Sequence, residues 1–143
     1  MTTSVAQLLK TPAGELDAMF KAAEAGPIPE GPADGTAIIA PGTAYSAEIA
    51  KMVNLFAWQG KVFDPKAGVL RNRISSFGLN AIVAKVYKGE SWLDGKDCIV
   101  IDYSDTSLVA HWIRDEIRLI QPGLYLGEVY WGKSQLIHFC LEV

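Results

Sequence analysis

Apolar residues in the N-terminal segment recur at the spacing of one face of an α-helix. They form two short stripes, Val5, Leu8 and Leu9, and then Leu16, Met19, Phe20 and Ala23. A Thr-Pro pair separates the stripes and a Gly-Pro pair follows the second, and both pairs are typical of helix ends. We therefore expect short helices within residues 3–25, which need packing against the rest of the chain to persist.

The next segment, residues 26–35 (GPIPEGPADG), is rich in proline and glycine, and we expect an extended linker there. Residues 36–40 are apolar and predict a short strand, which ends at a Pro-Gly pair. Residues 45–57 leave two alternatives open. Their alanine and valine positions fit a helix, whereas the sequence LFAW at their end fits the start of a strand.

From Trp58 onward the pattern changes to short β-type segments separated by turn signals. The predicted strands are 58–64, 68–74, 79–87, 98–103, 113–120, 124–131 and 135–143. The first two are joined by the turn sequence DPKAG and form a predicted hairpin. With the strand near residue 38 the count reaches about eight, at which a closed barrel can hold side chains or one small ligand.

The segment 107–121 (SLVAHWIRDEIRLIQ) fits two patterns. Val109, Ile113, Ile117 and Ile120 would form one stripe of a helix, whereas alternation along IRDEIRLI would form a strand. We favour the strand for residues 113–120, because it then forms a three-strand meander with the last two strands. A long helix here would leave an open sheet without an interior.

These elements predict an α+β fold that is mainly β, in which N-terminal helices precede an antiparallel barrel of about eight strands. The prediction is one domain over residues 1–143. Residues 1–30 would form the helical cap and linker, and residues 34–143 the barrel. The alternative of a structural domain with a packed interior would leave an edge strand that suits a homodimer.

Composition and charge exclude several classes of protein. The net charge is −3, so the chain lacks the basic excess that nucleic-acid binding requires. The N-terminus has no basic segment before an apolar core, and no apolar run approaches the length of a membrane span. We therefore expect a cytoplasmic protein, in which Cys98 and Cys140 are buried, reduced thiols.

Several short motifs together resemble a known type of protein. They are LDAMF (16–20), the Pro-rich link, Gly35 before a strand, WQGKVF (58–63), HWIRDEIRLIQPGLYLGEVY (111–130) and the terminal IHFCLE. This order of elements is similar to that of the small bacterial lipocalin-like families of the GXWXG and DUF4334 type. Ile113-Arg114 and Leu126-Gly127 would match their paired strands, while the first strand lacks the tryptophan and second glycine of the first family. The resemblance implies a calycin-like, ligand-holding barrel.

The charged residues of 113–120 are the main candidates for ligand contact. On a strand Arg114, Glu116 and Arg118 share one face, which is either a solvated surface of paired charges or a polar network inside the barrel. In the second case an arginine would bind a ligand carboxylate or carbonyl. The predicted ligand-binding residues are Tyr103, Trp112, Arg114, Glu116, Tyr125 and His138.

Chemistry at these positions is a second hypothesis. Asp102, Glu116 or His138 could act as an acid or base in the cavity of a cofactor-independent isomerase, lyase or cyclase. No catalytic residue can be assigned from the sequence. Neither histidine has a metal-ligand spacing such as HxxxH, so no metal and no cofactor are expected. The leading hypothesis is binding of a fatty acid, terpenoid or aromatic molecule, mainly apolar or amphipathic, inside the barrel.

Overall fold

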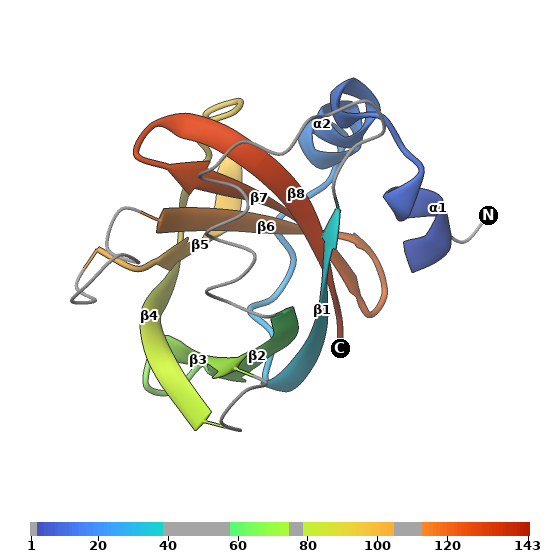
Figure 1. The fold of residues 1–143 in the computed structure, drawn as a ribbon. Helices are drawn as coiled ribbons and strands as arrows, with labels where there is room; N and C mark the ends of the chain where they lie inside the picture. The colour runs from blue at the N-terminus through green and yellow to red at the C-terminus, as the bar shows by residue number, and fades with distance from the viewer. Residues whose placement is uncertain (1–2, 39–57, 75–78, 105–112) are drawn as a thin grey trace.

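The computed structural model describes residues 3–38, 58–74, 79–104 and 113–143. Its core is a closed antiparallel barrel in which each strand pairs with the next in sequence and β1 pairs with β8 (Figure 1). The strands are β1 (Gly31–Ile38), β2 (Trp58–Asp64), β3 (Val69–Ile74), β4 (Leu79–Glu90), β5 (Asp97–Asp102), β6 (Ile113–Gln121), β7 (Leu124–Trp131) and β8 (Ser134–Glu142). The predicted fold class is confirmed.

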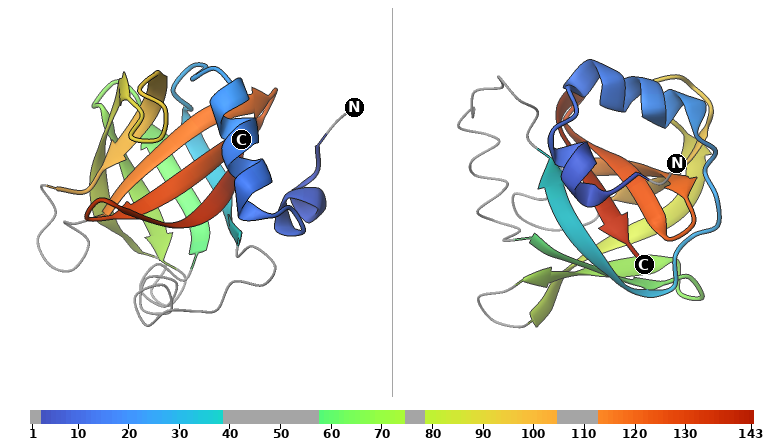
Figure 2. Two further views of the ribbon diagram at one scale, coloured as in Figure 1. Left: turned by 90° about the horizontal axis from the view of Figure 1, so that it is seen from above. Right: turned by 90° about the vertical axis from the view of Figure 1, so that its right-hand side faces the viewer.

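Two short helices precede the barrel, α1 (Val5–Leu9) and α2 (Ala13–Ala22). Ser4 begins α1 by accepting a hydrogen bond from the Gln7 N–H, and the Gln7 side chain accepts one from the Ser4 N–H, which forms a capping box. Figure 2 shows α2 lying across the outer surface of the orange to red strands β6 to β8. None of the helices described is long and apolar enough to cross a membrane.

The first strand begins earlier than the sequence predicted. β1 starts at Gly31, inside the segment interpreted as a linker. Proline is tolerated here because the first half of β1 pairs with β2, as in Pro32 with Val62, and only the second half pairs with β8. The linker is therefore shorter than predicted.

The segment 113–120, whose sequence fitted both a helix and a strand, is a strand, as predicted. Residues 113–121 form β6, which pairs with β5 on one side and β7 on the other. The barrel closes, so the described strands leave no free edge of the kind that the dimer hypothesis required. Residues 45–57, for which helix and strand were both open, lie outside the described residues.

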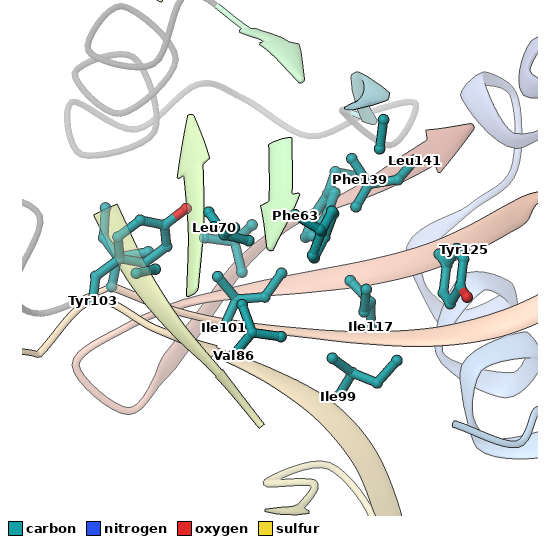
Figure 3. Packing of buried hydrophobic residues seen from close by; sticks show 14 of the residues in the cluster. Phe63, Leu70, Val86, Ile99, Ile101, Tyr103, Ile117, Tyr125, Phe139 and Leu141 are labelled. Atoms are coloured by element: carbon teal, nitrogen blue, oxygen red, sulfur yellow. The ribbon is translucent and has the colours of Figure 1, made fainter. Parts of the chain in front are cut away.

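The barrel wall separates two apolar clusters. The inner cluster consists of buried residues on the interior side of the barrel wall, among them the ten labelled in Figure 3. The other apolar cluster lies on the outer side of the wall, beneath the helices, and consists of Leu8, Leu16, Phe20, Ile38, Cys98, Val100, Leu124, Leu126 and Cys140. Both cysteines are free, buried thiols, as expected, and burial raises their pKa to about 12 for Cys98 and about 11 for Cys140.

Candidate functional site

Strand β6 presents charged residues to both sides of the barrel wall. Ile113 and Ile117 belong to the inner cluster, so Asp115 between them faces the interior. The even-numbered residues point outward, and Arg118 lies over the Phe20 ring of α2 at 4.5 Å. Alternation therefore places one acidic side chain inside the barrel and the remaining charged residues of the strand outside.

A buried ion pair projects from the inner wall. Lys61 of β2 is fully buried, Asp115 is 2% exposed, and Lys61 Nζ lies 3.4 Å from Asp115 Oδ2. The same ammonium group donates a hydrogen bond of 2.9 Å to the Tyr103 hydroxyl. It also lies 5.8 Å from the centre of the Phe139 ring, within the range of a cation–π contact. Strand β2, strand β6 and the residue after β5 thus bring an amine, a carboxyl and a phenol together in an apolar interior.

Burial shifts both members of this pair toward their neutral forms. Burial lowers the pKa of Lys61, although the Asp115 carboxylate opposes the change. Burial raises the pKa of Asp115 to about 6, and the nearby ammonium reduces this effect only in part. The cause is that a charge in a medium of low dielectric constant loses its hydration.

One atom of the pair has an unmet hydrogen-bonding capacity. Among the described residues, Asp115 Oδ1 is buried and accepts no hydrogen bond, whereas Oδ2 faces Lys61. An unpaired buried acceptor costs about 1–3 kcal/mol, so such atoms are uncommon in stable interiors. A ligand that donates a hydrogen bond would remove this cost.

The opposite end of the interior is covered by the segment between α2 and β1. Figure 3 shows Tyr125 at one end of the inner cluster and Tyr103 at the other. The Tyr125 hydroxyl donates a hydrogen bond of 2.6 Å to the Pro27 carbonyl. Ala25 and Ile28 of the same segment pack against the inner cluster. The Tyr125 end is therefore closed by the chain itself, and both predicted tyrosines line the interior.

Arg114 and Glu116 do not line the interior, which corrects one of the two interpretations of their face. Glu116 is fully buried on the outer wall, where it accepts hydrogen bonds from the Ser91 hydroxyl and the Trp92 N–H. Arg114 donates to the same carboxylate at 3.1 Å, and its guanidinium lies 4.3 Å from the centre of the Trp92 ring. The group fastens the β4–β5 loop to the barrel.

Arg118, farther along the outward face of β6, also fastens the β4–β5 loop to the barrel. It donates hydrogen bonds of 2.7 Å to both carboxylate oxygens of Asp94, and the guanidinium lowers the pKa of Asp94 to about 2. It also donates to three backbone carbonyls, those of Phe20, Lys96 and Asp97. This arginine therefore joins α2, the β4–β5 loop and β6.

His138 also lies on the outer wall, beneath α2. Its Nε2 atom is 2.7 Å from Asp17 Oδ1 and 3.5 Å from Glu128 Oε1. Burial alone would lower the pKa of His138, but the two carboxylates outweigh burial and raise the pKa. Burial raises the pKa of Glu128, whose other oxygen accepts a hydrogen bond from the Tyr130 hydroxyl.

The remaining predicted residues give a further correction. Asp102 shares the outward face of Cys98 and Val100, where it accepts a hydrogen bond of 3.0 Å from the Tyr87 hydroxyl. None of the three proposed acids or bases, Asp102, Glu116 and His138, projects into the interior. Each occupies the face of its strand opposite to the inner cluster, because strand alternation fixes the side. Trp112 lies outside the described residues.

The sequence interpretation missed Lys61 and gave Asp115 no role of its own. A signal was available in each case. Lys61 stands two residues before Phe63 in WQGKVFD, and Asp115 stands two residues from both Ile113 and Ile117 in IRDEI. A charge in phase with the apolar residues of a strand faces the same side as they do.

The fold has a counterpart among solved structures. A crystal structure of a protein from Thermomonospora curvata matches with a TM-score of 0.64 at 15% sequence identity, covering 93% of this chain and 88% of that chain. At this identity the likeness shows the fold alone. No family model matches the chain, and no curated protein matches it. The lipocalin-like family resemblance therefore stays a prediction.

Proposed function

We propose that the barrel binds one small, mainly apolar molecule whose hydroxyl group contacts the Lys61–Asp115 pair. The observation that carries this proposal is the buried Asp115 Oδ1 atom, which has no hydrogen-bond partner among the described residues. The surrounding wall is apolar, and it includes Ile101, Ile113 and Phe139. Binding sites for small molecules combine such a lining with a few polar groups that orient the ligand.

The chemistry of the pair favours a hydroxyl group over a carboxylate. A hydroxyl can donate to Asp115 Oδ1 and accept from a neighbouring donor such as the Lys61 ammonium. A ligand carboxylate would instead meet a second buried carboxyl, and the repulsion would require that one of them take up a proton. Terpenoid, aliphatic and aromatic alcohols therefore fit the site better than fatty acids do.

Closure of the Tyr125 end constrains the position of the ligand. The segment at Ala25, Pro27 and Ile28 covers that end. We therefore expect the apolar body of the ligand to lie along Ile101 and Ile117, with its hydroxyl group near Tyr103. A ligand held in this way would agree with the lipocalin-like family type that the sequence resembles.

Matched pairs of probes test the proposal. Geraniol, 1-dodecanol and 1-naphthol are each compared with the hydrocarbon that lacks the hydroxyl group, by displacement of a fluorescent hydrophobic dye and by the shift in melting temperature. We expect at least one alcohol to bind, and to bind about tenfold more tightly than its hydrocarbon, since a buried hydrogen bond contributes on the order of 1.4 kcal/mol.

A double variant, Lys61→Met/Asp115→Leu, should abolish the preference for the alcohol while keeping the barrel folded. Asp102→Asn, which changes an outward-facing carboxylate of the same barrel, serves as the matched control and should bind as the parent does. The proposal fails if no alcohol binds, or if the double variant retains the preference.

A second candidate function is acid–base catalysis on the bound molecule, with Asp115 in place of the residues named from the sequence. It is favoured by the rise in the pKa of Asp115 to about 6, where a carboxyl group can both donate and accept a proton near neutral pH. Incubation of bound alcohols, aldehydes or alkenes in D₂O, followed by NMR, would detect isomerisation or deuterium exchange. Catalysis requires that Asp115→Asn abolish such exchange while binding persists.

A further inference from the structure

Three side chains from three elements converge beneath α2, on the outer face of the barrel. Asp17 comes from α2, Glu128 from β7 and His138 from β8, and one ligand atom of each lies within 4.8 Å of the others. Glu128 is fully buried and His138 is 5% exposed, whereas the Asp17 side chain is 29% exposed. We refer to these three residues as the outer cluster.

Hydrogen bonds within the outer cluster leave one oxygen without a donor. The Nε2 atom of His138 carries at most one hydrogen, which points to Asp17 Oδ1 at 2.7 Å. The hydroxyl of Tyr130 donates to Glu128 Oε2 at 3.1 Å. Among the described residues Glu128 Oε1 receives no hydrogen bond, although it is buried and lies 3.5 Å from His138 Nε2.

We propose that Asp17, Glu128 and His138 bind a divalent transition-metal ion of the Zn²⁺ class, which fastens α2 to β7 and β8. Two carboxylates and a neutral imidazole carry two negative charges in total, and a divalent cation balances them, whereas a single proton on the histidine cannot. The ion would also give Glu128 Oε1 the partner that it lacks. One imidazole beside two carboxylates favours Zn²⁺ over Mg²⁺ or Ca²⁺, which prefer sites made only of oxygen.

The spacing requires only a small adjustment. Ligand atoms at about 2.0–2.2 Å from a tetrahedral Zn²⁺ ion lie about 3.3–3.6 Å apart. The distance of 3.5 Å between His138 Nε2 and Glu128 Oε1 already falls within this range. The 2.7 Å hydrogen bond between His138 and Asp17 must open by less than about 1 Å. Asp17 is the member that can move, because it is the most exposed and lies on the surface helix α2.

The neighbouring groups support an open fourth position. Gln135 donates a hydrogen bond of 3.0 Å to Asp17 Oδ1, and such outer contacts orient metal-binding carboxylates. The exposed fraction of Asp17 places solvent on one side of the outer cluster. A water molecule can therefore complete the coordination of a three-ligand site. The sequence shows no metal-binding spacing such as HxxxH, because Asp17 lies more than 100 residues before Glu128 and His138.

Isothermal titration of the tag-free, EDTA-treated chain with ZnCl₂, and in parallel with MgCl₂, tests this inference. We expect one Zn²⁺ site, a higher melting temperature with Zn²⁺, and no binding of Mg²⁺ at the same concentrations. Asp17→Asn and His138→Gln keep the size of each side chain and should each weaken Zn²⁺ binding at least tenfold, since each removes a ligand.

Two control variants separate this site from other sources of affinity. Glu15→Gln changes another acidic residue of α2, and His111→Ala removes the other histidine of the chain. Both should bind Zn²⁺ as the parent does. The inference is overturned if the parent binds no Zn²⁺, if His111→Ala abolishes binding, or if Asp17→Asn and His138→Gln bind with unchanged affinity.

Discussion

Two adjacent carboxylates on β6, Asp115 and Glu116, are both buried, but their surroundings are opposite. Glu116 accepts hydrogen bonds from the Ser91 hydroxyl and the Trp92 N–H of the β4–β5 loop, and from the guanidinium of Arg114 on its own strand. Asp115 faces the apolar interior with one amine beside it and one oxygen unpaired. Both oxygens of the Glu116 carboxylate therefore accept hydrogen bonds within the fold, whereas Asp115 Oδ1 has no hydrogen-bond donor among the described residues.

This contrast distinguishes stabilising from ligand-directed polar groups. Polar groups that stabilise a fold are usually fully hydrogen-bonded, because each unmet group is costly. A group that is kept buried and only partly paired is a candidate for function. The same contrast applies to Glu128, whose unpaired oxygen lies on the other side of the wall, at the proposed metal site.

The largest effect is expected on the outer wall. Arg118→Met would remove hydrogen bonds to Asp94 and to three carbonyls, of which the bond to the Phe20 carbonyl is buried. We expect the free energy of unfolding to fall by about 3–5 kcal/mol, measured by urea denaturation. Arg71→Met, which changes an exposed arginine of β3, should lower it by less than about 0.5 kcal/mol. Equal losses in the two variants would contradict the role of Arg118 in joining α2 and the β4–β5 loop to β6.

The inner wall should be sensitive to added volume. The Phe139 ring lies directly over Gly127, and a Cβ atom at Gly127 would stand 2.2 Å from Phe139 Cζ. Gly127→Ala should therefore displace the ring and cost about 1–3 kcal/mol in urea denaturation. Gly14→Ala, at a helix position with open space around it, should be neutral or slightly stabilising. A neutral Gly127→Ala would mean that the interior is looser than described.

The inner ion pair, unlike Arg118, should be dispensable for stability. Replacing both partners in Lys61→Met/Asp115→Leu removes two desolvated groups and one unpaired acceptor at once. We expect the free energy of unfolding to stay unchanged or to rise by about 1–2 kcal/mol, because apolar residues often replace a buried pair without loss. A marked loss of stability in denaturant would show that the pair holds the barrel together and is not reserved for a ligand.

The smallest expected effect is a pH dependence whose sign differs between the two walls. A carboxyl whose pKa is raised in the folded state, as that of Asp115 is to about 6, stabilises below its ordinary pKa of 3.8, and this contribution is lost as the pH rises through 6. The parent should therefore lose about 1 kcal/mol relative to Asp115→Asn between pH 5 and 7. If the free energies of unfolding of the two proteins, measured in urea, changed in parallel with pH, the raised pKa of the buried Asp115 would be contradicted.

Asp94 on the outer wall should behave in the opposite way. Its pKa is lowered to about 2 by Arg118, so its contribution is present above pH 3.8 and is lost as the pH falls toward 2. In urea denaturation, the free energies of unfolding of the parent and of Asp94→Asn should therefore approach each other as the pH falls from 4 to 2. A constant difference over this range would count against the Asp94–Arg118 pair.

Strand periodicity predicted much of this architecture from the sequence. The barrel and the strand at 113–120 followed from alternation and turn residues, and the shared face of Arg114, Glu116 and Arg118 followed from the same rule. Alternation alone cannot say which face points inward, because β6 is buried on both sides. Helix α2 and the β4–β5 loop cover the outer face, and that coverage depends on contacts distant in sequence. For the same reason the meeting of Lys61 with Asp115, and of Asp17 with His138, could not be predicted.

The most direct test follows the side-chain carboxyl of Asp115 by ¹³C NMR, with the resonance assigned by its loss in Asp115→Asn. In the free protein it should titrate with a pKa near 6, as buried carboxyls do. Adding an alcohol that raises the melting temperature should shift this resonance and its pKa, while the resonance of the outward-facing Asp102 stays in place. An Asp115 signal that titrates near 4, or that ignores every bound ligand, would contradict a binding site on the inner wall.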